Sequence, residues 1–343
     1  MSNDFLRDSI ARLMRGENYS RPEAARLLDA LLDSDATDGQ IAATLIALKL
    51  KGETIEELAG LAEAMRKHSV PINSRHGLFI DTAGTGSSCA KTFNVSTAAA
   101  FVVAGAGLPV AKHGNRAASS RCGSADVLTA LGVNVSVSPN ISEQCLNEIG
   151  MCFMFAPLYH GATARVAGIR RELGVQTTFN LLGPLTNPAH APRQIIGVWD
   201  RNLVEPLAKT LSLLGTERAW IVHGADGLDE VTISDKTFVA EASNGNVRTF
   251  EIEPEEFGFE KGTLDDMRSG DAEENAAIIR SVLSGGRRDE ARTLVLVNSA
   301  AALHVGGSAG DLREAVRLAE QSIDSGAAQT KLEQLIRRSS EPS

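Results

Sequence analysis

The chain has 343 residues, of which 43% are apolar and 22% charged, which is ordinary for a folded protein that buries a hydrophobic core. At about 150 residues per domain, this length predicts two domains or one large one. Lys and Arg number 34 against 43 for Asp and Glu, so the formal net charge is −9. Proteins that bind nucleic acid through its phosphates usually carry the opposite excess, so the charge argues against that class, although a local basic groove can lie within an acidic total.

Cysteine spacing and terminal sequence indicate the cellular compartment. The four cysteines, Cys89, Cys122, Cys145 and Cys152, form no CxxC pair and have no histidine at zinc spacing. Buried free thiols are the simpler interpretation of Cys145 and Cys152, and we expect Cys89 and Cys122 to take no part in catalysis. The N-terminal sequence MSNDFLRDSIARLMRG lacks the basic-then-apolar pattern of a signal peptide. No run approaches the roughly 18 apolar residues of a membrane span. We therefore expect a reducing, cytoplasmic location with no membrane partner.

Residues 1–72 are expected to form a small all-helical N-terminal domain, because apolar residues recur there at helical spacing. Three of the helical stretches begin with a capping-box pattern, in which a hydroxyl accepts from an amide three residues on and a Glu or Gln returns to the cap. The three pairs are Ser20 with Glu23, Thr37 with Gln40, and Thr54 with Glu57. We expect part of residues 160–190 to join this domain.

Residues 76–338 are expected to form a larger α/β domain. Short apolar runs predict strands at 78–80, 109–111, 195–199 and 219–223, and the alternation of Val133, Val135 and Val137 predicts another. Helices are expected between them at 96–106, 124–131 and 203–214, with 311–322 and 329–338 closing the chain, while the polar region 250–292 is expected to be peripheral. Strands that alternate with helices indicate a mostly parallel central sheet.

Two loops that follow predicted strands carry anion-binding groups. In segment 84–97 (GTGSSCAKTFNVST), a glycine turn leads into a helix and exposes backbone N–H groups and the positive helix end. It matches neither the Walker A pattern nor GxGxxG, so a structural turn with a capping Ser fits it as well as a phosphate cradle does. In segment 112–116 (KHGNR), two cations, an imidazole and an amide stand at a strand's carboxyl end, where open parallel sheets bind ligands. There we favour an anion site over a solvated loop of mixed charge.

Two further segments supply a pair of carboxylates and a segment whose glycine and two prolines indicate a rigid backbone. Asp229 and Glu230 are hard oxygen ligands suited to Mg²⁺, which keeps several waters and needs only one or two carboxylates. An Asp-Glu pair alone is ordinarily solvated surface, and only the two phosphate loops favour a metal role. Segment 179–188 (FNLLGPLTNP) follows Arg170 and Arg171, which either present a guanidinium to a carboxylate or pair with Glu172. Together the residues indicate a Mg²⁺-assisted enzyme for a phosphorylated, diphosphate-bearing substrate.

In this order, the segments resemble the anthranilate phosphoribosyltransferase family, and the likeness extends over nearly the whole chain. The matching strings are GTG at Gly84, TFNVST at Thr92, KHGNR at Lys112, GSADVL at Gly123, RRELG at Arg170, FNLLGPLTNP at Phe179 and DGLDE at Asp226. The resemblance implies transfer of the phosphoribosyl group of 5-phosphoribosyl 1-pyrophosphate (PRPP) to the amino nitrogen of anthranilate, with release of pyrophosphate, in tryptophan biosynthesis. It also implies a helical domain joined to an α/β domain, a homodimer formed through the helical domain, and two Mg²⁺ ions.

The resemblance assigns roles by position. The implied donor-binding residues are Gly84, Ser87, Ser88, Thr92, Asn94, Val95, Ser96, Thr97, Lys112, His113, Gly114, Asn115, Arg116, Ala117, Ala118, Ser119, Ser120 and Ser124. The implied acceptor-binding residues are Gly84, Asn115, Arg170 and Pro184, with Arg170 facing the acceptor's carboxylate. Ser96 is implied to help hold one Mg²⁺, while Asp229 and Glu230 hold a second. We expect no covalent nucleophile, because positioning and leaving-group stabilisation can carry the rate.

Two segments depart from the family pattern. Ser87 and Ser88 stand where the family has Gly and Asp, and His160-Gly161-Ala162-Thr163 replaces the family's HPAM beside the acceptor channel. The donor chemistry is therefore more firmly indicated than the acceptor, and a different aromatic amine is the first alternative. Pyrimidine nucleoside phosphorylases of the same superfamily lack KHGNR. A non-catalytic, nucleic-acid-binding relative is the remaining alternative, and the negative charge and 4% aromatic content argue against it.

Overall fold

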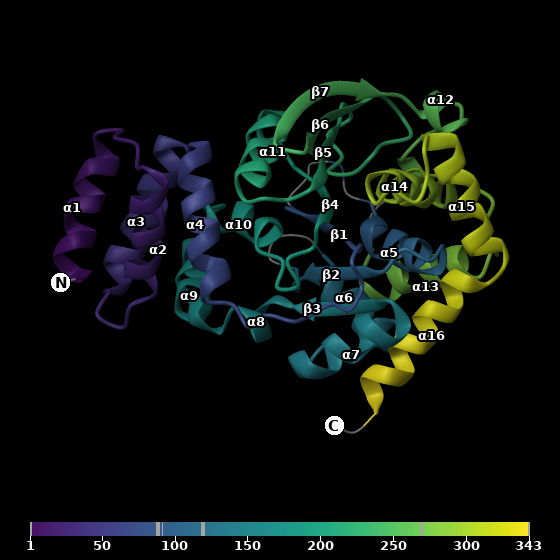
Figure 1. Ribbon diagram of the computed structural model, residues 1–343, viewed down its shortest axis with the longest axis horizontal. Coiled ribbons are helices and arrows are strands. Elements are labelled where there is room, and N and C mark those ends of the chain that lie inside the picture. The colour runs from purple at the N-terminus through teal and green to yellow at the C-terminus, as the bar shows by residue number, and fades with distance from the viewer. Residues whose placement is uncertain (1, 87–89, 91, 118–120, 268–269, 342–343) are drawn as a thin grey trace.

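A bundle of four helices forms one end of the molecule, where the chain begins (Figure 1). The computed structural model describes residues 2–86, 90, 92–117, 121–267 and 270–341. The bundle helices are α1 (Ser2–Met14), α2 (Arg21–Leu32), α3 (Asp38–Lys51) and α4 (Ile55–Lys67). Two of the three predicted capping boxes have the expected hydrogen bonds, since the hydroxyls of Thr37 and Thr54 accept from the amides of Gln40 and Glu57. At the third, the Glu23 carboxylate returns to the Ser20 amide (2.9 Å), but the Ser20 hydroxyl donates to that carboxylate (2.7 Å) and makes no cap hydrogen bond to the helix.

A buried ion pair ties the bundle together. The carboxylate of Glu57 accepts hydrogen bonds from the amides of Tyr19 (2.9 Å) and Thr54 (2.8 Å) and from Lys51 Nζ (2.8 Å). The side chains of Lys51 and Glu57 are only 4% and 1% exposed. A buried carboxylate is tolerated because every one of these donors is fixed, and it joins the start of α4 to the end of α3 and to the loop before α2.

The rest of the chain is built on a seven-stranded sheet of order β3-β2-β1-β4-β5-β6-β7. The first five strands in this order are parallel, while β6 and β7 are added as antiparallel strands at one edge. The predicted mostly parallel sheet is therefore confirmed. The strands are β1 (Ile80–Gly84), β2 (Val110–Gly114), β3 (Met151–Phe155), β4 (Arg193–Gly197), β5 (Arg218–Gly224), β6 (Thr237–Ser243) and β7 (Asn246–Ile252).

Helices cover both faces of the sheet (Figure 1). They are α5 (Val95–Gly105), α6 (Ser124–Ala130), α7 (Pro139–Ile149), α8 (Ala156–Tyr159), α9 (Ala164–Leu173), α10 (Phe179–Leu185), α11 (Val204–Leu213), α12 (Pro254–Phe257), α13 (Ala272–Leu283), α14 (Glu290–Val305), α15 (Leu312–Asp324) and α16 (Ala327–Ser340). Short 3₁₀ turns lie at Gly161–Thr163, Arg201–Leu203 and Asp265–Met267. None of the helices in the described part of the chain is long and apolar enough to cross a membrane.

The two faces of the sheet belong to two hydrophobic cores, because successive side chains of a strand point to opposite sides. Ile195 and Trp220 pack with α5, α13, α14 and α16 on one face. Their neighbours Ile196 and Ile221 pack with α11 and the helical bundle on the other face. Helices α9 and α10 join this second core through Val166, Ile169, Phe179 and Leu182. The bundle and the sheet are thereby held side by side, with α9 and α10 between them.

Two expectations from the sequence were wrong in this domain, and two elements were missed. The segment with Val133, Val135 and Val137 is not a strand: its valines alternate into the core, but the Asn134 amide donates to Ser339 Oγ of α16 (3.1 Å) instead of to a neighbouring strand. The region 250–292 is not uniformly peripheral, because α13 buries Ile279 and Leu283 completely. The apolar helix α14 and the hairpin β6–β7 were not predicted at all.

Candidate active site

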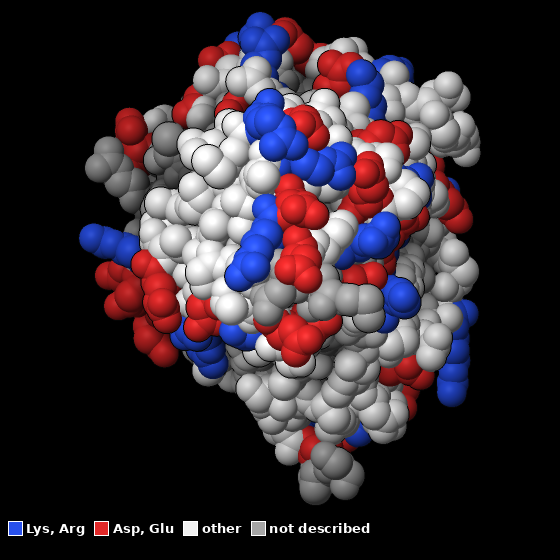
Figure 2. Space-filling view, turned by 90° about the vertical axis from the view of Figure 1, so that its left-hand side faces the viewer, with Lys and Arg blue, Asp and Glu red and all other residues white. Residues whose placement is uncertain are grey.

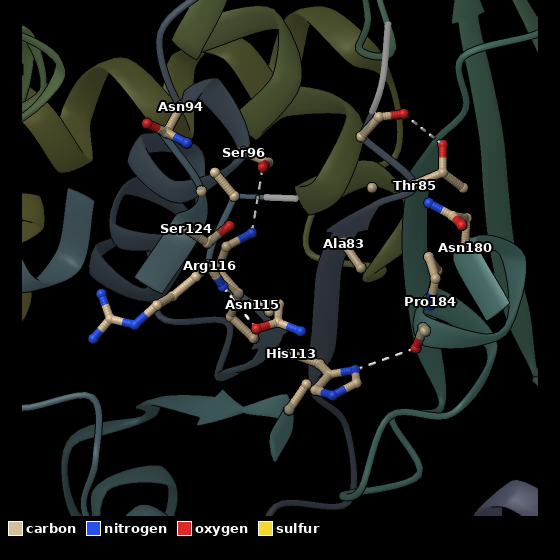
Figure 3. Close-up of a pocket in the computed structure, with 18 of the residues that line it drawn as sticks. Ala83, Thr85, Asn94, Ser96, His113, Asn115, Arg116, Ser124, Asn180 and Pro184 are labelled. Atoms are coloured by element: carbon tan, nitrogen blue, oxygen red, sulfur yellow. Dashed lines mark hydrogen bonds between the residues drawn. The ribbon is translucent and has the colours of Figure 1, made fainter. Parts of the chain in front are cut away.

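A cavity of about 400 Å³ lies where the carboxyl ends of β1 and β2 face α9 and α10. Figure 3 shows Asn94, Ser96 and Ser124 on one wall and Asn180 and Pro184 on the opposite wall, with His113 between them. The parallel strands bring their carboxyl ends to one edge, which explains why loops far apart in the sequence meet here. We call the first wall the sheet wall and the second the helical wall.

The first turn of α5 contributes backbone donors to the sheet wall. Asn94, Val95 and Ser96 line the cavity at the start of this helix, where the helix dipole favours an anion. The amide and the hydroxyl of Ser96 hydrogen-bond to the carboxylate of Glu230. Asn94 is held from both sides: its Oδ1 accepts from Asn275 (3.1 Å), and its Nδ2 donates to the carbonyl of Cys122 (3.3 Å). This amide therefore joins the start of α5 to the loop before α6.

The loop after β2 is closed by Asp126. Its carboxylate accepts from the amides of Ala117 (2.9 Å) and Gly123 (2.9 Å) and from Arg116 (2.8 Å). A Cβ atom at Gly123 would lie 2.4 Å from the nitrogen of Ala117, so only glycine allows this close approach. The turn delivers the N-terminus of α6, with Ser124, to the cavity. Arg116 also lines the cavity but is more than half exposed, and it pairs with Asp126.

Lys112 lies at the base of the sheet wall and is 1% exposed. Its Nζ donates to the carbonyl of Thr82 and lies 3.3 Å from Ser96 Oγ. Burial lowers the pKa of Lys112, while the negative charges of Asp81 and Glu230 act in the opposite direction. Asp81, which was not selected from the sequence, is completely buried and accepts from the His113 amide (3.1 Å), and burial raises its pKa to about 6.

Asp229 and Glu230 also line the cavity, beside the start of α5. Loss of solvent around Glu230, and secondarily the charge of Asp229, raises the pKa of Glu230 to about 8. Lys112 and hydrogen bonds from Ser96 oppose this shift. The carbonyl oxygen of Asp229 occupies the space that a Cβ atom of Gly197 would need, at 1.6 Å. The loop that carries Asp229 and Glu230 can therefore pack directly against the end of β4 only because residue 197 is glycine.

The donor set fits a magnesium ion that is completed by substrate. Burial, and to a smaller extent the charge of Asp229, disfavours the ionised form of Glu230, and a divalent cation would offset both effects. The Ser96 hydroxyl lies near them as an additional oxygen ligand. Within the described residues, no cluster of three or more His, Cys, Asp and Glu side chains could hold a metal. An ion at this place therefore needs phosphate oxygens or water for most of its coordination.

The helical wall presents one guanidinium. Arg170, near the end of α9, is half-buried, and its terminal nitrogen donates to Asn180 Oδ1 (3.0 Å). The guanidinium carbon lies 5.5 Å from the centre of the Phe179 ring, and burial lowers the pKa of Arg170. Asn180 also accepts from the Thr177 amide (3.0 Å), so its side chain is fixed. Arg170 is thus positioned toward the cavity, while Arg171 is exposed.

Two neutral histidines lie between the walls. The His113 Nδ1 atom lies 3.2 Å from the carbonyl of Gly183, and since a carbonyl only accepts, Nδ1 carries the proton. The His160 ring is 5.2 Å from the His113 ring. Burial lowers the pKa of His113 to about 3 and that of His160 to about 4. Both rings are therefore uncharged across the physiological range and leave the anionic contacts to Lys112 and Arg170.

The cavity brings together most of the residues that the sequence selected. Those that line it are Gly84, Thr92, Asn94, Val95, Ser96, Lys112, His113, Gly114, Asn115, Arg116, Ala117, Ser124, Arg170, Pro184, Asp229 and Glu230. Of the described candidates only Thr97 does not line it, because its side chain points into the core and is completely buried. Ser87, Ser88, Ala118, Ser119 and Ser120 lie outside the described residues.

Several lining residues were not selected as site residues from the sequence. Asn180 belongs to the conspicuous string 179–188, and its spacing of three after Thr177 is typical of a side chain that returns to a helix start. Thr85, Met65, Ala164 and Ala167 carry no such signal. Cys122 lines the cavity as well, but burial raises the pKa of its thiol, which disfavours a thiolate nucleophile.

Comparisons with known proteins agree with this geometry. Two family models match, "Glycosyl transferase family, helical bundle domain" at residues 7–69 and "Glycosyl transferase family, a/b domain" at residues 76–329. The anthranilate phosphoribosyltransferase of Moorella thermoacetica is 51% identical over 332 residues, which cover 97% of this chain and 98% of that protein. The chain belongs to the anthranilate phosphoribosyltransferase family.

Solved structures of this family have the same fold. The enzyme from Thermus thermophilus superimposes with a TM-score of 0.91 at 38% identity, covering 97% of this chain and 100% of that one. The enzyme from Saccharomyces cerevisiae in complex with PRPP and Mg has a TM-score of 0.89 at 30% identity, with 98% of each chain covered. The same yeast enzyme has also been solved in complex with 4-fluoroanthranilate, with a TM-score of 0.88, 29% identity and 98% of each chain covered.

In the metal-free protein, Glu230→Gln should raise the melting temperature, and by more at about pH 8 than at about pH 6. A carboxyl whose pKa rises on folding, here from 4.5 to about 8, binds its proton more tightly in the native state. Native stability therefore falls as the pH rises through this window, by at most about 1.4 kcal/mol per pH unit. Thermal unfolding in a chelator measures the difference. Glu251→Gln, at an exposed carboxylate, is the control, and equal pH slopes in wild type and Glu230→Gln would contradict the assignment.

Proposed function

We propose that the chain transfers the phosphoribosyl group of PRPP to the amino group of anthranilate, giving N-(5-phosphoribosyl)anthranilate and pyrophosphate, in a Mg²⁺-dependent step of tryptophan biosynthesis in the cytoplasm. One observation carries this proposal: a single cavity has an anion-binding wall with two carboxylates and an opposite wall with one fixed guanidinium. Such a cavity is matched to a diphosphate-bearing donor on one side and a small carboxylate-bearing acceptor on the other. The yeast relative, solved with PRPP and Mg, supports the donor and the metal.

The sheet wall is suited to bind the donor. The positive ends of α5 and α6 face the cavity at Ser96 and Ser124, and Lys112 supplies a buried positive charge below them. Departure of pyrophosphate concentrates negative charge on the leaving group while the ribose C1′ becomes cationic, so fixed positive groups at the leaving-group side lower the barrier. Ser96, Asp229 and Glu230 would hold Mg²⁺, which offsets leaving-group charge when bound. We assign two ions here.

The helical wall is suited to bind the acceptor. Arg170 can form a charge-assisted hydrogen bond with a carboxylate, and its contact with the Phe179 ring limits its freedom. Pro184 lines the same wall, where its carbonyl accepts from Gln194 (3.0 Å). An aromatic amine is nucleophilic without prior deprotonation, so orientation toward C1′ is the main requirement. The small residues Thr163, Ala164 and Ala167 border this wall, and they favour a substituted aromatic amine as the alternative acceptor.

We propose that two copies associate through the helical bundle. The most exposed large apolar side chains in the described chain are those of Leu50 (83%) and Met14 (79%), at the ends of α3 and α1. Figure 2 views the molecule from the side of the bundle and shows uncharged surface crossed by side chains of both signs. Such a surface is suited to a self-complementary contact, which needs an apolar centre and paired charges at its rim.

The activity itself is tested by the fluorescence of anthranilate, which should fall when the whole chain is mixed with PRPP and Mg²⁺. No fall is expected without Mg²⁺, or with the double variant Asp229→Asn, Glu230→Gln, which removes both carboxylate charges. Pyrophosphate release should match the loss of anthranilate. If PRPP with Mg²⁺ raises the melting temperature but anthranilate is not consumed, the acceptor is a different amine. Full activity of the double variant would remove the metal assignment.

Arg170→Ala should raise the KM for anthranilate about 10- to 150-fold with a much smaller change in the KM for PRPP, because a charge-assisted hydrogen bond contributes about 1.5–3 kcal/mol. Steady-state kinetics with each substrate varied in turn separates the two constants. Arg171→Ala is the matched control, since it removes the neighbouring, exposed guanidinium of the same helix. A larger effect on PRPP than on anthranilate would contradict the role of Arg170.

Leu50→Glu should shift the protein from dimer to monomer in light scattering at micromolar concentration, because a charge would be buried in the centre of the contact. Leu213→Glu introduces the same charge at another exposed leucine, on α11, and should leave the dimer intact. A wild-type chain that is monomeric, or a dimer that tolerates Leu50→Glu, would rule out association through this surface.

A further inference from the structure

The loop that carries Asp229 and Glu230 is fixed at both ends by side chains outside the cavity. It leaves β5 at Gly224 and ends at Val231, and it places two carboxylates next to each other. Both carboxylates line the cavity, so their position depends on how the backbone of this loop is held. The backbone of this short segment must therefore be held by contacts with the rest of the protein.

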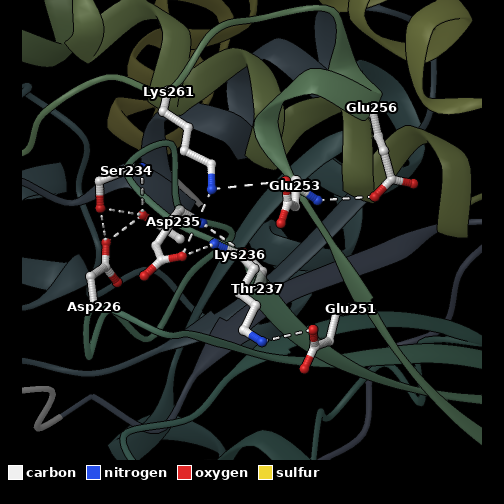
Figure 4. A network of polar contacts seen from close by, with 10 residues as sticks. Asp226, Ser234, Asp235, Lys236, Thr237, Glu251, Glu253, Glu256 and Lys261 are labelled. Atoms are coloured by element: carbon white, nitrogen blue, oxygen red, sulfur yellow. Dashed lines mark hydrogen bonds and ion pairs between the residues drawn. The ribbon is translucent and has the colours of Figure 1, made fainter.

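Asp226 fixes the first half of the loop. Its carboxylate accepts from the Leu228 amide (3.0 Å), from Ser234 Oγ (2.5 Å) and from the Thr232 hydroxyl. Figure 4 shows Asp226 and Ser234 facing each other in this network. The turn at Gly227 has a φ of 86°, which glycine adopts without strain. These contacts join the turn to residues that directly follow the loop, so they shape it but do not attach it to a helix of the core.

Asn298 of α14 attaches the second half of the loop to the core. Its Oδ1 accepts from the Val231 amide (2.9 Å), and its Nδ2 donates to the Val231 carbonyl (2.9 Å) and to the Leu294 carbonyl (2.8 Å). The orientation of this amide is unambiguous, because two carbonyls require the nitrogen on their side. One side chain, 3% exposed, thus satisfies both backbone groups of the residue that directly follows Glu230.

We propose that Asn298 is a positioning residue that holds Asp229 and Glu230 in place for the divalent cation. The inference rests on the metal role in the proposed function. On the side of the loop that faces away from Asn298, the Asp229 carbonyl packs against Gly197 at the end of β4. Asn298 and Glu230 also line a common small cavity with Ser96, so the amide lies close behind the carboxylate pair. The loop is therefore in contact with Gly197 on one side and with Asn298 on the other.

Loss of this amide has a specific expected effect. In Asn298→Ala, the buried N–H and C=O of Val231 lose their partners, and the loop loses its attachment to α14. Mutation of a residue that orients metal ligands typically lowers the metal affinity by about 10- to 100-fold. We therefore expect the dissociation constant of Mn²⁺, measured in the presence of PRPP and without acceptor, to rise about 10- to 100-fold. Water-proton relaxation measures this binding without any turnover.

Ser299→Ala is the matched control. Ser299 follows Asn298 in the same helix and is equally buried, but its hydroxyl donates to the Val295 carbonyl (2.7 Å) within α14. Both variants remove a buried hydrogen-bonding group from α14, so a merely structural effect appears in both. Hydrogen exchange of the Val231 amide is the second measurement. It should be slow in the wild type and in Ser299→Ala, and at least about tenfold faster in Asn298→Ala.

Asn298→Asp keeps an acceptor for the Val231 amide but loses the donor to the Val231 carbonyl, so its Mn²⁺ affinity should lie between those of wild type and Asn298→Ala. This variant decides the question if Asn298→Ala does not fold. The proposal is overturned if both Asn298 variants bind Mn²⁺ as the wild type does, or if Ser299→Ala weakens binding equally. A wild-type protein that binds no Mn²⁺ with PRPP would instead show that the metal role in the proposed function is wrong, and the inference would fail with it.

Discussion

The buried charge of Lys112 is the constraint on which the cavity depends. An ammonium group that is 1% exposed loses most of its solvation, and the carbonyl of Thr82 replaces only part of it. The remaining compensation comes from the negative charges of Asp81 and Glu230. Conversely, the raised pKa values of these two carboxyls, about 6 and about 8, indicate that neither is fully stabilised by Lys112. The free protein therefore holds a charge arrangement that a bound anion and cation would complete.

The fold could be predicted from the sequence where local chemistry decides it. The capping boxes at Thr37 and Thr54 form as expected because all their groups lie within four residues. The alternation of Val133, Val135 and Val137 led to a wrong strand prediction. An alternating pattern shows which side chains are buried, but it does not show whether a neighbouring strand pairs with the backbone. Here α16 provides the partner of Asn134 from 205 residues away. The apolar helix α14 was not predicted because burial on all sides leaves no periodic signal.

The candidate site could be predicted to the extent that it consists of loops at the ends of parallel strands. Segments 84–97, 112–116 and 229–230 lie at or just after the carboxyl ends of three strands of one sheet, so their common edge is a consequence of the topology. The strand predicted at 109–111 is longer than expected, since Lys112–Gly114 belong to β2 and not to the loop after it. The residues that hold these loops in place could not be found this way. Asn298 contacts Val231 across 67 positions and Asn275 contacts Asn94 across 181, and neither pairing leaves a mark in the local sequence. The candidate ligand-binding residues could therefore be found from the sequence, whereas the residues that hold them in place could not.

The two walls of the cavity rest on different hydrophobic cores. Helices α5 and α6 pack in the core on one face of the sheet, whereas α9 and α10 pack in the core that the opposite face shares with the bundle. Arg66 of α4 links the second core further, since it donates to the carbonyl of Leu185 (2.9 Å) at the end of α10. In the proposed function the helical wall takes the acceptor and the sheet wall takes the donor, so each substrate would be positioned by a different hydrophobic core. A substitution in the bundle that changes the second core would therefore act first on the wall that carries Arg170.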